Sequence, residues 1–165
     1  MATTRLAFSV MQGNEGRPAP SFRRPSPMNK QRILSTVDLE RLRAMIRDAV
    51  TTGSVPRARL CALNSELGQA QIVAPREMPK GVVTMNSTVR FHDLDGEDEE
   101  ETYTLVYPGF ADPAHGCLSI LAPLGTALLG HREGEVVEWD APFGRRRLRL
   151  EEVTFQPESV GLYDV

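Results

Sequence analysis

The segment LSILAPLGTALLG, residues 118–130, decides the fold, because it joins a buried strand directly to a short helix. Its first four residues point alternately to two faces, as side chains do along a strand. Pro123 then fits the first turn of a helix, where its missing N–H leaves no hydrogen bond unmade. Apolar residues follow at helical spacing, and Gly130 can adopt the left-handed conformation that ends a helix.

The chain after residue 81 is predicted to form a sheet around this corner. Apolar or alternating patterns place strands at residues 82–85, 88–92, 101–107, 118–121, 135–140 and 145–155. Asp95-Gly96 is a strong turn signal between the second and third of these strands. The four residues from Ala141 to Gly144 predict a tight turn between the last two.

Two amphipathic helices are predicted before the sheet. Ser35 followed three residues later by Asp38 resembles a capping box and marks the first start. Apolar residues recur at a/d spacing over residues 39–49 and again over 60–70, with a Gly/Ser turn between them. Neither stripe can be buried alone, so we expect an antiparallel helical hairpin, or short coiled coil, over residues 31–74.

The remaining segments read as irregular. Residues 1–30 are rich in Pro and Arg, which predicts a disordered extension, and their apolar run is too short for a secretory signal. Residues 75–81 read as a linker between the hairpin and a C-terminal domain over residues 82–157. We expect the tail, residues 158–165, to be loosely held.

Charge is distributed unevenly along the chain. Residues 1–81 carry 13 Lys and Arg against 6 Asp and Glu, and residues 82–165 carry 6 against 16. This difference fits a charged partner or two differently biased solvated surfaces. We interpret the acidic run 97–101 as a solvated hairpin rim, since no His or Cys is spaced to complete a metal site. The arginines at 145–147 lack interleaved aromatic residues, so a solvated sheet edge is favoured over a phosphate or nucleic-acid site.

No catalytic, metal-binding or cofactor-binding pattern is found. His92, His115 and His131 are scattered and read as surface residues, and neither a G-x-S-x-G nor a P-loop pattern occurs. The two cysteines form no CxxC pair, which favours a reduced, cytoplasmic setting. No apolar run approaches the roughly 18 residues of a membrane span. We therefore expect a protein that is not an enzyme, needs no cofactor and does not contact membranes.

A string of short segments resembles the regulator of nucleoside diphosphate kinase family, a branch of the GreA/GreB transcript-cleavage factors. The segments are MP at 78–79, VVTMNS at 82–87, YTLVYP at 103–108, the corner at 118–130 and FQPE at 155–158. The similarity spans about residues 36–157. It implies an α+β protein with a short N-terminal coiled coil and an FKBP-like antiparallel C-terminal domain. It also implies docking on RNA polymerase at the rim of the secondary channel.

The resemblance aligns the polymerase-docking loop of Gre factors with residues 119–123. The Gre pattern there is Ser, apolar, Asp or Asn, Ser, Pro, so Ser119 and Pro123 match. Leu121 and Ala122 replace the two polar residues, which implies a more apolar contact. Strand alternation favours an exposed Leu121. The predicted polymerase-binding residues are Ser119, Leu121, Ala122, Pro123 and Leu124.

The tip of the predicted hairpin departs from the Gre pattern. Gre factors carry an acidic pair at the tip of a long coiled coil, where the carboxylates help to hold a catalytic Mg²⁺ in the polymerase. The tip residues here are Asp48, Thr51, Thr52, Gly53 and Ser54. Asp48 is the only acid among them, and arms of about 15 residues reach only about 22 Å. Both features argue against induced transcript cleavage.

Three functions remain open. The first is a monomeric, non-catalytic transcription regulator that competes with Gre-type factors on the polymerase and meets nucleic acid only through that complex. It would alter nucleoside diphosphate kinase levels indirectly. The second is direct contact with nucleoside diphosphate kinase. The third is a prolyl isomerase, suggested only by the FKBP-like fold; aromatic residues make up 6% of the chain, which gives little material for the aromatic pocket that this chemistry needs.

Overall fold

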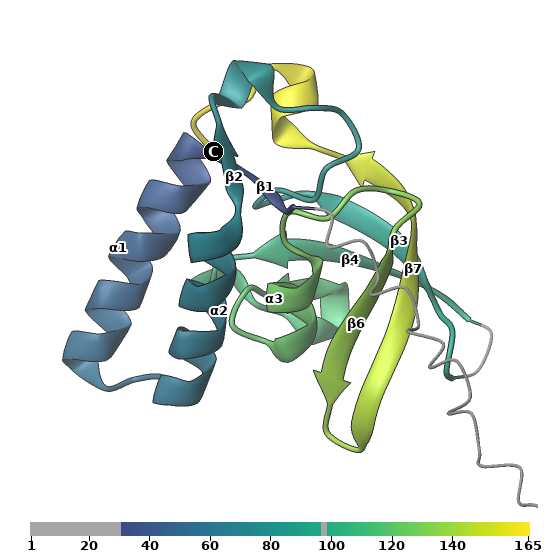
Figure 1. The fold of residues 1–165 in the computed structure, drawn as a ribbon, viewed down its shortest axis with the longest axis horizontal. Helices are drawn as coiled ribbons and strands as arrows, with labels where there is room; N and C mark the ends of the chain where they lie inside the picture. The colour runs from purple at the N-terminus through teal and green to yellow at the C-terminus, as the bar shows by residue number, and fades with distance from the viewer. Residues whose placement is uncertain (1–30, 97–98) are drawn as a thin grey trace, which may run out of the picture. The chain divides into compact units, whose positions relative to one another are not determined.

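A computed structural model describes residues 31–96 and 99–165 of the chain (Figure 1). The extension predicted over residues 1–30 and two residues of the acidic run lie outside the described residues. The predicted α+β class is confirmed: two longer helices precede a mixed sheet, and a third, short helix follows the strand at one edge of that sheet.

Helices α1 (Thr36–Thr52) and α2 (Arg57–Gln69) lie side by side and are joined by a short turn (Figure 1). The predicted start of α1 is confirmed, since the Ser35 hydroxyl accepts a hydrogen bond of 3.0 Å from the Asp38 N–H. Gly53, with a φ of 63°, ends the helix. The apolar positions that spacing singled out are buried in one cluster, namely Leu42 and Ala49 of α1 with Leu60, Leu63 and Leu67 of α2.

Two short strands that the sequence did not indicate flank the helices and pair with each other. Strand β1 (Ile33–Ser35) precedes α1, and β2 (Gln71–Val73) follows α2. The two pair in parallel, with Leu34 opposite Ile72. Three-residue strands carry too little alternation to be distinguished from a helix flank, so only the pairing reveals them.

The main sheet has the strand order β5-β4-β3-β7-β6. Its members are β3 (Thr88–Asp93), β4 (Glu100–Val106), β5 (Cys117–Ser119), β6 (Val136–Ala141) and β7 (Gly144–Phe155). All neighbours are antiparallel except β4 and β5. The expected purely antiparallel sheet is therefore wrong at this edge, because a crossover rather than a hairpin connects these two strands.

The predicted strand at residues 82–85 is also wrong. Val82 forms only an isolated bridge with Arg132, although the whole segment is buried. Its backbone bonds to the loop after the short helix, where the Val83 N–H donates to the His131 carbonyl at 2.8 Å. A buried segment that pairs with no strand has the same run of apolar residues as a buried strand, so the sequence does not distinguish the two.

The corner at residues 118–130 forms as predicted, with a shorter strand. Strand β5 ends at Ser119, and α3 (Pro123–Leu128) begins at the proline. A side chain at Gly125 would overlap the Ser119 carbonyl oxygen, so only glycine lets the helix fold back this closely. The Thr126 hydroxyl donates to the Ile120 carbonyl at 2.7 Å and fixes the angle between strand and helix.

The arginines at 145–147 lie in the part of β7 that pairs with β6 alone, because the pairing of β7 with β3 ends at Leu148. Arg146 also pairs with Asp93 at 2.6 Å, and Arg147 pairs with Asp95 at 2.7 Å.

The C-terminal tail is held by specific contacts, contrary to the expectation. The Glu158 carboxylate accepts from the Thr84 hydroxyl at 2.8 Å. Near the chain end, the Arg41 guanidinium donates to the Asp164 carbonyl at 2.8 Å. The tail therefore packs against the start of α1 and the segment before β3.

Leu128 tests the packing of the corner. Its side chain is completely buried, so we expect Leu128→Ala to lower the free energy of unfolding by about 2–5 kcal/mol. Urea denaturation followed by circular dichroism measures this change. Leu162→Ala, at a side chain that is 45% exposed, should stay within about 0.5 kcal/mol of wild type. Equal losses in both variants would contradict the described core.

Asp38 gives the stability a specific pH dependence. Its buried carboxylate accepts from the Met85 N–H at 3.2 Å. Desolvation raises the pKa of Asp38 to about 6, and the nearby Glu158 carboxylate adds to the rise. The folded state therefore binds the Asp38 proton more tightly than the unfolded chain does. The contribution of protonated Asp38 to the free energy of unfolding is complete below about pH 4 and is lost as the pH rises through about 6.

Asp38→Asn should remove this dependence. We expect the variant to gain stability relative to wild type between pH 4 and pH 7, by up to about 3 kcal/mol. Urea denaturation of both proteins at the two pH values measures the difference. Parallel pH profiles would show that Asp38 is not the titrating group.

Candidate functional site

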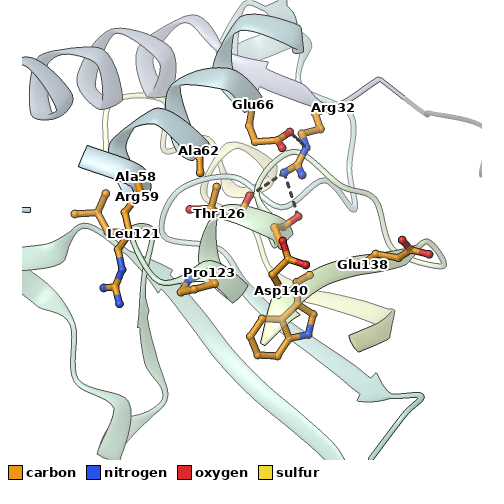
Figure 2. Close-up of a pocket in the computed structure, with 12 residues that line it drawn as sticks. Arg32, Ala58, Arg59, Ala62, Glu66, Leu121, Pro123, Thr126, Glu138 and Asp140 are labelled. Atoms are coloured by element: carbon orange, nitrogen blue, oxygen red, sulfur yellow. Dashed lines mark hydrogen bonds and ion pairs between the residues drawn. The ribbon is translucent and has the colours of Figure 1, made fainter. Parts of the chain in front are cut away.

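A cleft of about 330 Å³ lies between α2, α3 and β6 (Figure 2). Small or apolar side chains form much of its wall, with Ala58 and Ala62 from α2, Pro123 from α3 and Trp139 from β6. Charged groups, including Arg59 and Asp140, stand at its rim. This mixture of an apolar wall and a charged rim is typical of a surface that binds another protein.

The structure brings two of the five predicted polymerase-binding residues, Leu121 and Pro123, into this cleft. Pro123 is exposed, whereas Ser119, Ala122 and Leu124 are half-buried. The expected exposure of Leu121 is wrong, since only 7% of it is accessible and it packs in the core cluster. Strand alternation does not apply there, because β5 has already ended at Ser119.

Ser119 holds the loop in shape. Its hydroxyl accepts from the Leu121 N–H at 3.2 Å, and its carbonyl accepts from the Ala122 N–H at 3.0 Å. These two bonds turn the chain inward after β5 and carry Leu121 into the core. The serine that matches the Gre pattern therefore has a structural role in this chain.

Arg32 forms one wall of the cleft and was missed by the sequence analysis. One guanidinium nitrogen, Nη1, donates to the carbonyls of Thr126, Ala127 and Leu129 at 2.8, 3.1 and 2.9 Å. Its Nε pairs with Glu66 of α2 at 2.7 Å, and Figure 2 shows the contacts with Glu66 and Thr126. Burial lowers the pKa of Arg32, and the Glu66 charge opposes this change. No local pattern could indicate partners more than 30 residues away.

His131 lies close to this cluster and is not the surface residue that was expected. Its side chain is 18% exposed, and Nδ1 lies 2.9 Å from the Glu135 carboxylate. Burial lowers the pKa of His131, and the neighbouring Arg32 charge lowers it further. The imidazole is thus part of the packing around the start of the loop after α3.

Three of the predicted tip residues, Asp48, Thr51 and Thr52, end α1, and Gly53 and Ser54 lie in the turn to α2. All five are exposed. The Thr51 and Thr52 hydroxyls donate back to the carbonyls of Arg47 and Asp48 at 2.9 and 3.0 Å. Thr52 also shares a 2.9 Å hydrogen bond with the Ser54 hydroxyl. The tip hydroxyls thus complete the end of the helix, and Asp48 alone supplies a carboxylate there.

In the described ranges, 31–96 and 99–165, no group of three or more His, Cys, Asp or Glu side chains is arranged to hold a metal ion. No helix within these ranges has the length and apolar character needed to cross a membrane.

Comparisons with known proteins bear on both halves of the chain. The family model "Transcription elongation factor, GreA/GreB, C-term" matches residues 78–155. The chain is 41% identical over 132 residues to the regulator of nucleoside diphosphate kinase of Escherichia coli K12, an alignment that covers 79% of this chain and 94% of that protein. It is 38% identical over 96 residues to transcription elongation factor GreA of Listeria welshimeri, covering 58% and 59% of the two chains.

A solved structure shows the same relationship. The GreA/GreB transcription elongation factor from Nitrosomonas europaea superposes with a TM-score of 0.60 at 43% identity, covering 76% of this chain and 98% of that one. High identity over nearly the full length of two such relatives is far more specific than any single motif. The chain therefore belongs to the regulator of nucleoside diphosphate kinase family, a branch of the GreA/GreB transcription elongation factors.

Proposed function

We propose that this protein is a non-catalytic transcription regulator that binds RNA polymerase at the rim of the secondary channel. There it competes with Gre-type factors and does not stimulate transcript cleavage. The main support is one combination of features: a loop matching the Gre docking position, and a two-helix arm whose tip has a single carboxylate. Family membership supports the choice of polymerase as partner.

The loop at residues 119–124 is built to present a fixed surface. Leu121 anchors it from inside, while the exposed Pro123 faces the cleft. The two Ser119 bonds and the Thr126 bond to Ile120 hold the turn rigid. The loop therefore loses little conformational entropy when a partner binds, which favours specific binding.

The two-helix arm is suited to occupying the secondary channel and not to supplying a ligand for a catalytic metal ion. With 17 and 13 residues, α1 and α2 extend about 26 and 20 Å. Mg²⁺ is bound through carboxylate oxygens, and the tip offers only Asp48. An arm of this kind can block access without adding a metal ligand to a distant active centre.

The domain plan that goes with this function is part of the proposal. Residues 31–74 act as a short helical hairpin, 75–81 link it to an FKBP-like domain over 82–157, and the protein works as a cytoplasmic monomer. Prolyl isomerase activity is disfavoured, since Trp139 is the one aromatic residue among those that line the cleft in the described parts.

The name of the E. coli relative favours a second candidate, direct regulation of nucleoside diphosphate kinase. The same surface could contact the kinase itself. Pull-down with purified kinase separates the two: capture of the kinase without polymerase supports direct contact, and an effect only in transcribing extracts supports the polymerase route.

Pro123→Asp tests the docking loop. An acid is tolerated at the start of a helix, so the fold should remain, but a charge enters an apolar contact. We expect at least about a tenfold loss of affinity for core polymerase, measured by biolayer interferometry. Leu121→Asp is unsuitable for this test, because a buried charge would unfold the corner.

Pro113→Ala is the matched control for the loop. Pro113 is also exposed and also begins a short helical turn, but it precedes β5. Its affinity for core polymerase should stay within about twofold of wild type. Equal effects of Pro113→Ala and Pro123→Asp would move the interface away from the loop, and absence of binding by the folded wild type at micromolar concentration would end the proposal.

The arm makes a prediction of its own. Stalled elongation complexes should show no shortening of the nascent RNA when this protein is added, because Asp48 alone cannot replace an acidic pair. Cleavage stimulated by a Gre factor should fall as this protein is titrated in. Denaturing gels of end-labelled RNA measure both. RNA shortening by the protein alone would refute a blocking role.

A further inference from the structure

The segment after Gly161 contacts the two-helix arm. Figure 1 shows the end of the chain beside the start of α1. The Asp164 carbonyl accepts a hydrogen bond of 2.8 Å from the Arg41 guanidinium of α1. The Tyr163 ring centre lies 5.0 Å from the Arg76 guanidinium carbon, in the linker between the arm and the sheet. These two contacts join the outer part of the tail to the arm and to its linker.

The segment before Gly161 is anchored more firmly, in the sheet domain. Gln156 is 4% exposed, and its side chain donates to the Pro79 carbonyl at 3.0 Å and accepts from the Gly81 N–H at 3.1 Å. The Glu158 carboxylate accepts from the Thr84 hydroxyl. We call residues 156–160 the inner anchor. Buried polar groups that are paired in this way are costly to separate.

The outer residues are held by exposed contacts alone. The hydrogen bond between Arg41 and Asp164 is exposed, and the side chains of Leu162 and Val165 are 45% and 44% exposed. Segments that bury little apolar surface and have exposed hydrogen bonds open at the lowest free energy. Gly161, with a φ of 83°, lies at the boundary and has the conformational freedom of a glycine. The outer residues can therefore detach while the inner anchor stays in place.

The outer tail and Arg32 hold different helices of the arm. Arg32 pairs with Glu66 of α2, whereas the tail is bonded to Arg41 of α1. Arg41 lies five residues after the first residue of α1, which is about 7.5 Å along the helix. Restraints on both helices limit rotation of the arm about its base more than a restraint on one helix does. Loss of the tail contact leaves α2 held and α1 less restrained.

We propose that residues 161–165 form a releasable strap that fixes the direction of the arm. When the strap is closed, it holds α1 through Arg41 and the linker through Arg76. When it is open, the arm keeps its contact through Arg32 but samples a wider range of angles about its base. The inference rests on the proposed function in one respect: the closed strap directs the arm into the channel and makes blocking efficient.

Removal of residues 162–165 tests the strap. Spin labels on Cys61 of α2 and on Glu151→Cys of β7, both exposed positions, report the distance between arm and sheet, and Cys117→Ser removes the other native thiol. Double electron–electron resonance on the free protein measures the distance distribution. We expect the distribution of the truncated protein to be at least about twofold broader than that of the full chain. An unchanged distribution would refute the strap.

Arg41→Ala removes the tail contact from the side of the arm and should also broaden the distribution. Combined with the truncation it should add no further broadening, because the truncation already removes this contact. If circular dichroism shows that the truncated chain does not fold, Arg41→Ala decides the question. Arg43→Ala is the matched control, since Arg43 is also an exposed arginine of α1. Equal broadening by the two arginine variants would contradict the proposal.

Polymerase assays separate the strap from the proposed function. The truncated protein should bind core polymerase within about twofold of the full chain, because the loop at residues 119–124 is distant and unchanged. It should take at least about threefold more truncated protein to halve Gre-stimulated RNA cleavage, since a smaller fraction has a correctly directed arm. Equal blocking by the two proteins would refute the strap. If the full chain does not bind polymerase, the proposed function fails, and the distance distributions alone decide whether the strap exists.

Discussion

The contacts of one guanidinium join the two-helix arm to the strand-to-helix corner. Arg32 donates to three carbonyls at the end of α3 and pairs with Glu66 of α2. The last carbonyls of a helix have no partner within the helix, and a guanidinium carries enough donors to serve several of them at once. Because donor and acceptors are half-buried, these charge-assisted bonds are strong. They fix the arm of α1 and α2 to the corner that carries the proposed docking loop.

The proposed function depends on this connection. A loop that docks at the rim of a channel directs an inserted arm only if loop and arm keep a constant angle. Arg32 supplies one restraint, and the parallel pairing of β1 with β2 supplies another at the base of the arm. The same contacts shape the cleft, since α2, α3 and β6 all contribute to its walls. Docking surface and arm direction are therefore set by one group of interactions.

Buried polar groups at the base of α1 explain why the chain after the linker is not a strand. Asp38 bonds to the backbone of Met85, and Thr84 bonds to Ser87 and to Glu158 in the tail. These side chains satisfy backbone and hydroxyl groups that would otherwise need a neighbouring strand. They also tie the C-terminal tail to the start of the arm, which makes the tail part of the domain.

The sequence by itself determined the helix starts and ends, most strands, the strand-to-helix corner and the family. Caps, turns and alternation depend on neighbouring residues, so local physics contains them. Only the tertiary structure decided the burial of Leu121, the parallel edge strand β5, the interior position of β7, and the role of Arg32. Each of these depends on segments far apart in the chain, and no local preference specifies which distant backbone or charge will be the partner.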